Sequence, residues 1–348
     1  MRVVNPKSLL LSLLLLCAVS FSLTAQDARK EYHESFPAGE GVTLASDVAY
    51  AQMEILSWEK DEVDVFAEVV VEASSQSRAE ERLRKIEVNI TKSGNTILVE
   101  TDYDDGWSNN AKVKVNIVVK APAYLNLNME HKYGDLFLQE ISGHVMLELK
   151  YGNIKAGRLT RGSAKPINSM ELAYSNGTIE EAGSLELEIA YSDMEIDDSE
   201  YLLVESKYSK ISGEKAGVIS AEGAYDKYTF DDVGSFSAGL KYSGVKFENL
   251  RKSFHLDAQY TNVKLEHVSS GFNEIQCSLS YGNFNADVDS GASYKFEGEA
   301  RYGSVNVAGE GRLSRNQEKE STRVWGTVGS NPKAEMSLVT RYGNINIE

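Results

Sequence analysis

Tyr281 begins the hexapeptide YGNFNA, Tyr302 begins YGSVNV and Tyr342 begins YGNINI. In each hexapeptide a tyrosine precedes two small or polar residues, then an apolar residue, any residue and a second apolar residue. Related hexapeptides begin at Tyr133, Tyr151, Tyr174, Tyr191, Tyr208, Tyr225, Tyr242 and Tyr260, and an earlier copy, YAQMEI, begins at Tyr50. Twelve of the 18 tyrosines in the chain therefore belong to one repeated context.

The spacing of this repeat predicts the fold class. Successive tyrosines from Tyr133 to Tyr302 are 17 to 23 residues apart, and Tyr342 follows after 40. A period of this length is typical of a solenoid, in which each coil buries its apolar face against its neighbours. We predict an all-β, single-stranded β-solenoid (β-helix) of about eleven coils, preceded by a mixed β region that carries one short helix.

The parity of apolar residues around each tyrosine predicts a corner. Leu187 and Ile189 precede Tyr191 by four and two residues, whereas Met194 and Ile196 follow it by three and five. Because alternate residues of a strand share a face, the tyrosine and the apolar residues before it are predicted to face the core together. The change of parity places the corner at the two residues after the tyrosine, which are mostly Gly, Ser, Asn or Asp.

Stacked coils would align the tyrosines. We predict a structural ladder formed by the eleven tyrosines from Tyr133 to Tyr342, because their parity matches the core positions. A row of aromatic rings that grips sugars is the functional alternative.

The outward positions carry a second pattern. The third residue before the tyrosine is acidic in Glu130, Glu148, Glu171, Glu188, Glu205, Glu222, Asp257 and Glu299. The residue directly before it is basic in Lys132, Lys150, Lys207, Lys241, Arg301 and Arg341. These rows are interpreted as a solvated face whose charges offset one another, and docking of a charged glycan or protein is the alternative.

Residues 1–25 are predicted to be a signal peptide. Arg2 and Lys7 precede an apolar run at residues 9–21, and small residues follow near position 25. The mature chain is expected to be exported to the periplasm, the cell surface or the medium, without membrane insertion. Removal of Cys17 leaves Cys277, which stands at an inward strand position and is expected to be a buried hydrophobe.

Residues 26–124 are predicted to form the N-terminal β-rich region and solenoid cap, and residues 125–348 the repeat domain. A helix is expected over residues 78–86, with Ser77 as its N-cap and Glu80 completing a capping box. Strands at 86–91 and 95–101 should form a hairpin. The acidic segment 102–106 lacks the spacing of a calcium loop and is interpreted as a solvated turn.

Composition and motifs exclude several functions. The formal charge of −16 argues against nucleic acid and anionic membranes as partners. The five histidines lack metal-ligand spacing, and no nucleophile elbow, phosphate loop or dinucleotide fingerprint occurs. No catalytic, metal-binding or cofactor-binding residues are therefore predicted, and the protein is expected not to be an enzyme.

Two stretches interrupt the rhythm and are expected to carry specificity, since function tends to lie on insertions into a regular scaffold. One is residues 161–169, and the other is the excursion 308–330, interpreted as a projecting loop or a lid. Because the chain ends directly after YGNINI, the last coil should leave an open strand edge through which copies could self-associate.

With these residues in view, the sequence resembles the bacterial "putative adhesin" β-strand-repeat family, a domain of unknown function related to the GIN-type "putative autotransporter adhesin" heads. The Tyr-Gly-Asn corners, residues 50–65 and the strand ending at 120–122 carry the resemblance. Six middle copies depart from it by placing Ser, Asp or Thr after the tyrosine. The resemblance implies an exported β-solenoid at the cell envelope and supplies no catalytic residues.

The sequence leaves three functions open. The leading hypothesis is a non-catalytic, adhesin-like binding protein that presents the solenoid surface to a glycan or protein partner. The alternatives are an envelope scaffold that assembles through terminal coils and a polysaccharide-cleaving enzyme.

Overall fold

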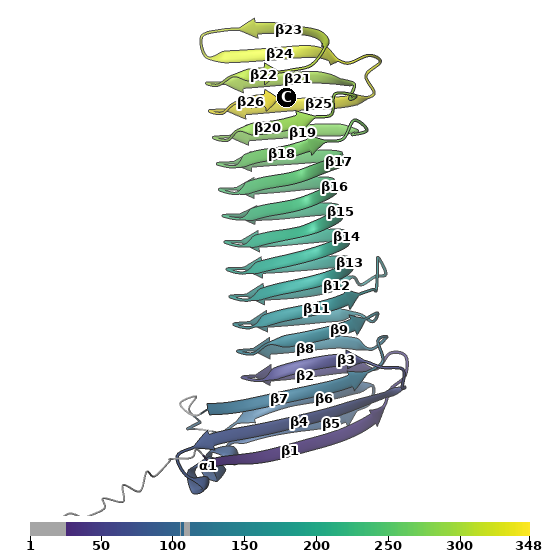
Figure 1. Cartoon of the computed structure of the whole chain (residues 1–348), viewed down its shortest axis with the longest axis vertical. Coiled ribbons are helices and arrows are strands. Elements are labelled where there is room, and N and C mark those ends of the chain that lie inside the picture. The colour runs from purple at the N-terminus through teal and green to yellow at the C-terminus, as the bar shows by residue number, and fades with distance from the viewer. Residues whose placement is uncertain (1–25, 105, 108–111) are drawn as a thin grey trace, which may run out of the picture.

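The computed structural model describes residues 26–104, 106–107 and 112–348. They form a rod of stacked coils, with a group of longer strands at the N-terminal end and a hairpin at the other end (Figure 1). The described part contains 26 strands and one helix, α1 (Gln76–Leu83). The predicted all-β solenoid is therefore confirmed, while the predicted signal peptide lies outside the described residues.

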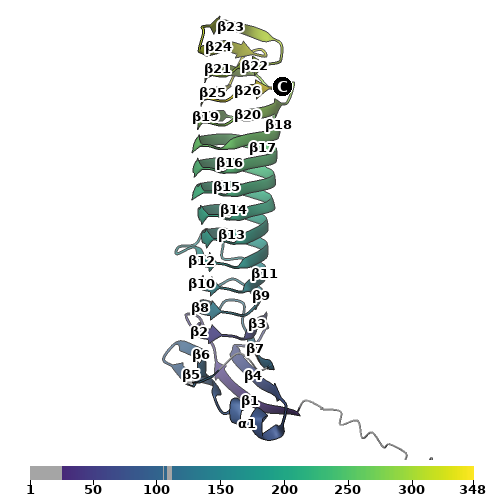
Figure 2. The ribbon, with the colours of Figure 1, turned by 90° about the vertical axis from the view of Figure 1, so that its left-hand side faces the viewer.

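Strand pairing follows two opposite sides of the rod, here named sheet A and sheet B (Figure 2). Sheet A contains, in spatial order, β5 (Ile86–Ser93), β6 (Thr96–Tyr103), β2 (Thr43–Ala49), β8 (Asn126–Lys132), β10 (Val145–Lys150), β12 (Asn168–Ala173), the second halves of β13 (Asn176–Ala190), β14 (Asp193–Lys207), β15 (Lys210–Ala224), β16 (Lys227–Lys241) and β17 (Gly244–Gln259), then β19 (Glu274–Ser280), β25 (Ala334–Arg341), β21 (Tyr294–Arg301), β24 (Ser321–Val328) and β23 (Gly311–Gln317). Sheet B contains β1 (Gln26–Pro37), β4 (Glu62–Ala73), β7 (Lys112–Ala121), β3 (Gln52–Ser57), β9 (Leu136–Ile141), β11 (Asn153–Leu159), the first halves of β13 to β17, then β18 (Asn262–Val268), β20 (Phe284–Val288), β26 (Ile345–Ile347) and β22 (Val305–Val307).

The core lies between the two sheets and follows the predicted alternation. Leu187 and Ile189 of sheet A and Met194 and Ile196 of sheet B are at most 1% exposed. Each such side chain stabilises the fold by about 1.5–3 kcal/mol relative to an exposed position. Cys277 is buried in the same way, and burial raises the pKa of its thiol, so its interpretation as a core residue is confirmed.

The tyrosine of each repeat does not face the core, and that part of the prediction is wrong. The eleven tyrosines from Tyr133 to Tyr342 are 40–51% exposed. All twelve repeat tyrosines, including Tyr50, have φ between 52° and 65°, in the left-handed region. The residue before each tyrosine already points outward. The left-handed backbone turns the tyrosine outward as well, and the residue after the tyrosine points inward. The parity therefore changes at the tyrosine itself.

Stacking between coils offsets the strain of this conformation. A left-handed backbone costs an L-residue with a Cβ about 1–2 kcal/mol. An aromatic pair contributes about 0.5–1.5 kcal/mol beyond its buried area, and each inner tyrosine belongs to two pairs. Its backbone N–H also donates to the next coil, as from Tyr133 to the Lys150 carbonyl at 3.0 Å.

The N-terminal region continues both sheets. β2 pairs with β8 and β3 with β9, so both sheets pass residue 124 without interruption. The predicted hairpin is confirmed as β5 and β6. The helix begins at Gln76 with Ser75 as its N-cap, so the predicted cap at Ser77 is wrong; Glu80 accepts a hydrogen bond from the Gln76 side chain instead. The predicted acidic turn lies partly outside the described residues.

The C-terminal coil is inserted between two earlier coils. β25 pairs with β19 on one side and β21 on the other, and β26 lies between β20 and β22. The predicted open edge after the last hexapeptide is therefore wrong. The excursion 308–330 closes this end as the antiparallel hairpin β23–β24, and Arg315 donates to the Val305 carbonyl at 2.6 Å.

Candidate functional site

The repeat tyrosines form one continuous stack along an edge of the rod. Neighbouring ring centroids are 4.6–5.1 Å apart, and the ring planes differ by 3–15°. The order follows space rather than sequence, because Tyr342 lies between Tyr281 and Tyr302. Trp107 and Tyr103 pack against Tyr50 at the N-terminal end. Since inner rings cover each other's faces, they offer a sugar only their edges and hydroxyl groups.

The charged rows of sheet A are only partly paired. Lys150 lies 2.6 Å from Glu148 and 3.5 Å from Glu171, and Lys132 lies 3.6 Å from Glu130. The register places alanines beside Glu171 and Glu188, where a lysine would otherwise stand. The row thus remains predominantly acidic, and each exposed pair contributes at most about 1 kcal/mol.

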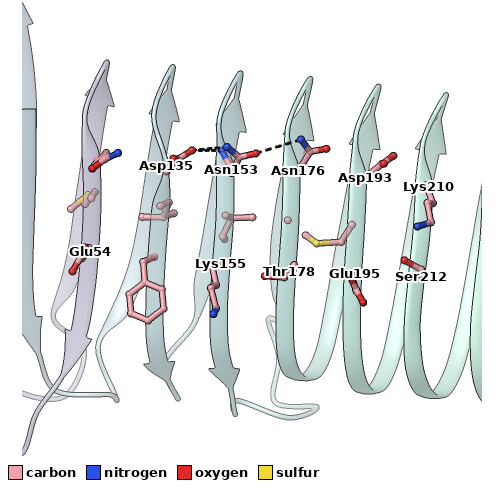
Figure 3. Close-up of a pocket in the computed structure, with 17 residues that line it drawn as sticks. Glu54, Asp135, Asn153, Lys155, Asn176, Thr178, Asp193, Glu195, Lys210 and Ser212 are labelled. Carbon is pink, nitrogen blue, oxygen red and sulfur yellow. Dashed lines mark hydrogen bonds between the residues drawn. The ribbon is translucent and has the colours of Figure 1, made fainter. Parts of the chain in front are cut away.

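A trough with a volume of about 890 Å³ lies on sheet B (Figure 3). It crosses six coils, from β3 to β15, or about 24 Å at the usual strand spacing. Two rows of outward side chains line it. The row nearer the tyrosines, here named the corner row, contains Gln52, Asp135, Asn153, Asn176, Asp193 and Lys210. The other, here named the inner row, contains Glu54, Phe137, Lys155, Thr178, Glu195 and Ser212.

Hydrogen bonds between coils fix half of the corner row. The Asn153 side-chain amide donates to Asp135 Oδ1 at 2.7 Å, and the Asn153 backbone N–H donates to the same oxygen at 3.1 Å. Asn176 Nδ2 donates in turn to Asn153 Oδ1 at 3.4 Å (Figure 3). These three side chains are therefore held in place before any ligand arrives.

The inner row is available for contacts. Among the described residues, its polar side chains form no side-chain hydrogen bond or ion pair with one another or with the rest of the chain. Phe137 adds one half-buried aromatic ring, and Lys155 stands on the next coil. The whole trough combines four carboxylates, two ammonium groups, three carboxamides and two hydroxyls with this ring.

Sequence reasoning did not find the trough. Neither 161–169 nor 308–330 lines it, because the first lies mostly between β11 and β12 and the second forms the hairpin β23–β24 at the end of the rod. One signal was present: Gly177 stands at the third position after Tyr174, where most other coils have an apolar residue. Met194 and Ile154 fill the space that its missing side chain leaves. Outward Phe137 was a second signal.

Two features are absent from the described residues. No group of three or more His, Cys, Asp or Glu side chains there is arranged to hold a metal ion. No helix in this part of the protein has the length and apolar character needed to cross a membrane.

Fold and site together define a β-solenoid with a preformed polar trough on one sheet. The family model of Toastrack DUF4097 matches residues 54–348, which is most of the chain. The protein belongs to the Toastrack DUF4097 family, and the predicted resemblance to an adhesin-like domain of unknown function is confirmed. No curated protein matches the chain.

Several solved structures are similar over nearly the whole chain. A "putative cell adhesion protein" from Clostridium sporogenes is 14% identical, with a TM-score of 0.21 and coverage of 92% of this chain and 99% of its own. A "putative adhesin" from Parabacteroides distasonis is 9% identical, with a TM-score of 0.31 and coverage of 92% and 97%. A "putative lipid binding protein" from the same species is 12% identical, with a TM-score of 0.27 and coverage of 91% and 96%.

Proposed function

We propose that this protein is an exported, non-catalytic, adhesin-like binding protein whose sheet B trough holds an extended glycan chain. The observation that carries the proposal is the pair of polar rows that repeats once per coil across six coils. A polymer of hydroxylated units lying along the rod axis meets a fresh set of donors and acceptors at each coil. Phe137 provides an apolar ring for one sugar face.

The composition of the trough favours a glycan over the other partner classes. Protein interface cores are depleted in charged residues and enriched in aromatics, whereas the trough has six charged groups and one ring. Four carboxylates against two ammonium groups disfavour a nucleic acid backbone. The inserted C-terminal coil is paired on both sides, so it does not offer the strand edge that the scaffold alternative assigned to it, and the edge strands at this end are β22 and β23.

The test compares two arginine substitutions in one coil region. Thr178→Arg fills the trough, and Ser169→Arg adds the same side chain to the outward face of sheet A. Binding of cellohexaose, chitohexaose and xylohexaose is measured by calorimetry for both variants and the unmodified protein. We expect one of the three to bind, and Thr178→Arg, but not Ser169→Arg, to weaken binding at least tenfold.

Chain length and product formation sharpen the same experiment. Affinity should rise from the disaccharide to the hexasaccharide, since longer chains reach more coils. Absence of binding to all three hexasaccharides, or equal loss in both variants, would overturn the proposal. Release of reducing ends from any of them would instead support the polysaccharide-cleaving alternative.

A further inference from the structure

The acidic row of sheet A is first interrupted at Gly239. Eight consecutive coils or strands place a carboxylate there in register: Glu100, Asp47, Glu130, Glu148, Glu171, Glu188, Glu205 and Glu222. The next coil has Gly239, and the coil after it has Asp257. The interruption therefore separates two carboxylates by about 9.6 Å, or two strand spacings.

A depression of about 580 Å³ surrounds Gly239. This volume lies within the range of about 300–1,000 Å³ that is usual for small-molecule sites. Glu222 and Asp257 bound the depression along the rod axis. Lys241 and Gln259 bound it on the side of the tyrosine stack, and the hydroxyl group of Ser237 lies on the other side.

The charged groups around the depression are directed toward it or unpaired. A Cβ placed on Gly239 would lie 2.4 Å from Glu222 Oε2, so this carboxylate leans into the space above the glycine. In the part of the chain that the structure describes, neither Glu222, Asp257 nor Lys241 takes part in an ion pair. Their hydrogen-bonding capacity is therefore available to a ligand.

The interior beneath this wall is polar as well. Ser206 donates to Asp226 Oδ2 at 2.9 Å, and its hydroxyl lies 2.6 Å from that of Tyr228. A Cβ on Gly223, which lines the depression, would lie 2.3 Å from Asp226 Oδ2. Only a glycine backbone thus separates the depression from a buried carboxylate, and no large apolar side chain projects into the depression.

We propose that this depression binds one neutral, polyhydroxylated unit, that is, a single uncharged sugar residue. The two carboxylates disfavour an anion, the ammonium group of Lys241 offsets one of their two charges, and the mostly polar lining disfavours a hydrophobic ligand. A sugar hydroxyl both donates and accepts, and so it matches a set of carboxylate, ammonium, carboxamide and hydroxyl groups. The site lies on the sheet opposite the trough and does not depend on the function proposed for the trough.

Restoring the acidic row tests the proposal. Gly239→Glu fills the depression with the side chain that seven of the eight acidic positions of this row already carry, and Gly239 has no left-handed backbone that would resist it. Val339→Glu adds the same charge in the same row, beyond the depression. Binding of glucose, galactose and N-acetylglucosamine, with glucosamine and galacturonate as charged probes, is measured by saturation-transfer NMR.

We expect at least one neutral sugar to bind the full chain, Gly239→Glu to weaken it at least tenfold, and Val339→Glu to leave it unchanged. The trough variant Thr178→Arg should also leave it unchanged, which separates the two sites. If Gly239→Glu lowers the unfolding midpoint, Ser237→Tyr blocks the same space. The proposal would be overturned if no neutral sugar binds or if a charged probe binds more tightly than the neutral sugars. It would also be overturned if Gly239→Glu and Ser237→Tyr both bind the sugar as tightly as the unmodified protein does.

Discussion

The corners toward the two ends of the rod and those in its middle reach the same turn by opposite means. In the glycine corners, the residue after the tyrosine is Gly134, Gly152, Gly282, Gly303 or Gly343, and an added Cβ would lie 1.8–2.0 Å from a main-chain oxygen of the adjacent coil. In the polar corners, that residue is Ser175, Ser192, Ser209, Asp226, Ser243 or Thr261. Its side-chain oxygen accepts a backbone N–H from the preceding coil at 2.9–3.4 Å.

Both kinds of corner solve one hydrogen-bonding problem. A corner turns a backbone N–H toward the neighbouring coil, and a buried N–H without an acceptor is costly. In most glycine corners the acceptor is the side chain of the second residue after the tyrosine. Asn283, for example, accepts the backbone N–H of Asn344 at its Oδ1 atom, at 2.9 Å. Glycine permits the close approach, and asparagine or aspartate replaces the missing hydroxyl. The residue pair, rather than the glycine alone, therefore defines a corner.

Exchanging the corner residues should expose this difference most strongly. Gly343→Ser places a Cβ 1.8 Å from the Gly282 carbonyl, within a coil that is enclosed on both sides, and should cost about 3 kcal/mol in unfolding free energy. The reverse change, Ser192→Gly, loses one acceptor and should cost about 1–2 kcal/mol. Urea denaturation measures both. Equal losses would show that the two corners are interchangeable.

The next largest effect is the pH dependence of stability that His131 causes in the coil of the Gly134 corner. His131 is fully buried, its Nε2 lies 3.1 Å from the Ala51 carbonyl, and burial lowers the pKa of His131 to about 4. The unfolded chain binds a proton near pH 6.5, but the folded chain does not. The free energy of unfolding is therefore highest above pH 6.5, and His131 lowers it by about 3 kcal/mol as the pH falls from 6.5 toward 4.

His131→Leu should remove this loss, because other coils have leucine at the equivalent inward position. Unfolding free energies measured between pH 7 and pH 4 test this, with exposed His267, which has no side-chain hydrogen bond or ion pair among the described residues, changed to Gln as the control. A variant that keeps the full acid-dependent loss would contradict the expectation.

Alternation and spacing predicted the fold class because they report what strands bury. They could not show that the tyrosine turns outward, since a left-handed residue shifts parity without changing the spacing of its neighbours. They also could not show the insertion of the C-terminal coil between Tyr281 and Tyr302, because similar repeats can stack in more than one order.

The trough was harder to predict than the fold. It is built from outward residues at regular positions, where sequence gives few constraints, and it depends on contacts between coils such as Asp135 to Asn153. Reasoning from insertions favoured 161–169 and 308–330, which close or decorate the rod instead. Breaks within the repeat, at Gly177 and Gly239, were the better signals.

The tyrosine stack is common to both kinds of corner, so its loss should not distinguish them. Tyr208 lies in a polar corner with neighbouring ring centroids at 5.0 and 4.6 Å, and Tyr281 lies in a glycine corner. Asn also tolerates the left-handed region, so either Tyr→Asn change mainly removes ring stacking and should cost about 1–2 kcal/mol. At Tyr208 it also removes the contact with Lys207 Nζ, which lies 5.7 Å from the ring centroid. Changing either to Ala should cost about 1 kcal/mol more. Urea denaturation of the four variants tests this, and unequal losses at the two tyrosines would contradict it.

The smallest effect belongs to the one polar corner in which the residue directly after the tyrosine is acidic. Asp226 is buried, accepts the Ser209 N–H at 2.9 Å, and burial raises the pKa of its carboxyl above the ordinary value of 3.8. The folded chain thus holds this proton more tightly than the unfolded chain. The contribution to stability is greatest below pH 3.8 and is lost as the pH rises through the folded pKa, which is opposite to His131.

Asp226→Asn keeps the acceptor for Ser209 and removes the titration, so unfolding at pH 7 should require slightly more urea. Exposed Asp193→Asn is the matched control, because it removes a carboxylate from a corner without burial. If the Asp226 variant keeps the pH dependence of the unmodified chain above pH 4, the buried carboxylate does not cause it. The polar corners would then differ from the glycine corners in geometry alone, with no difference in their response to pH.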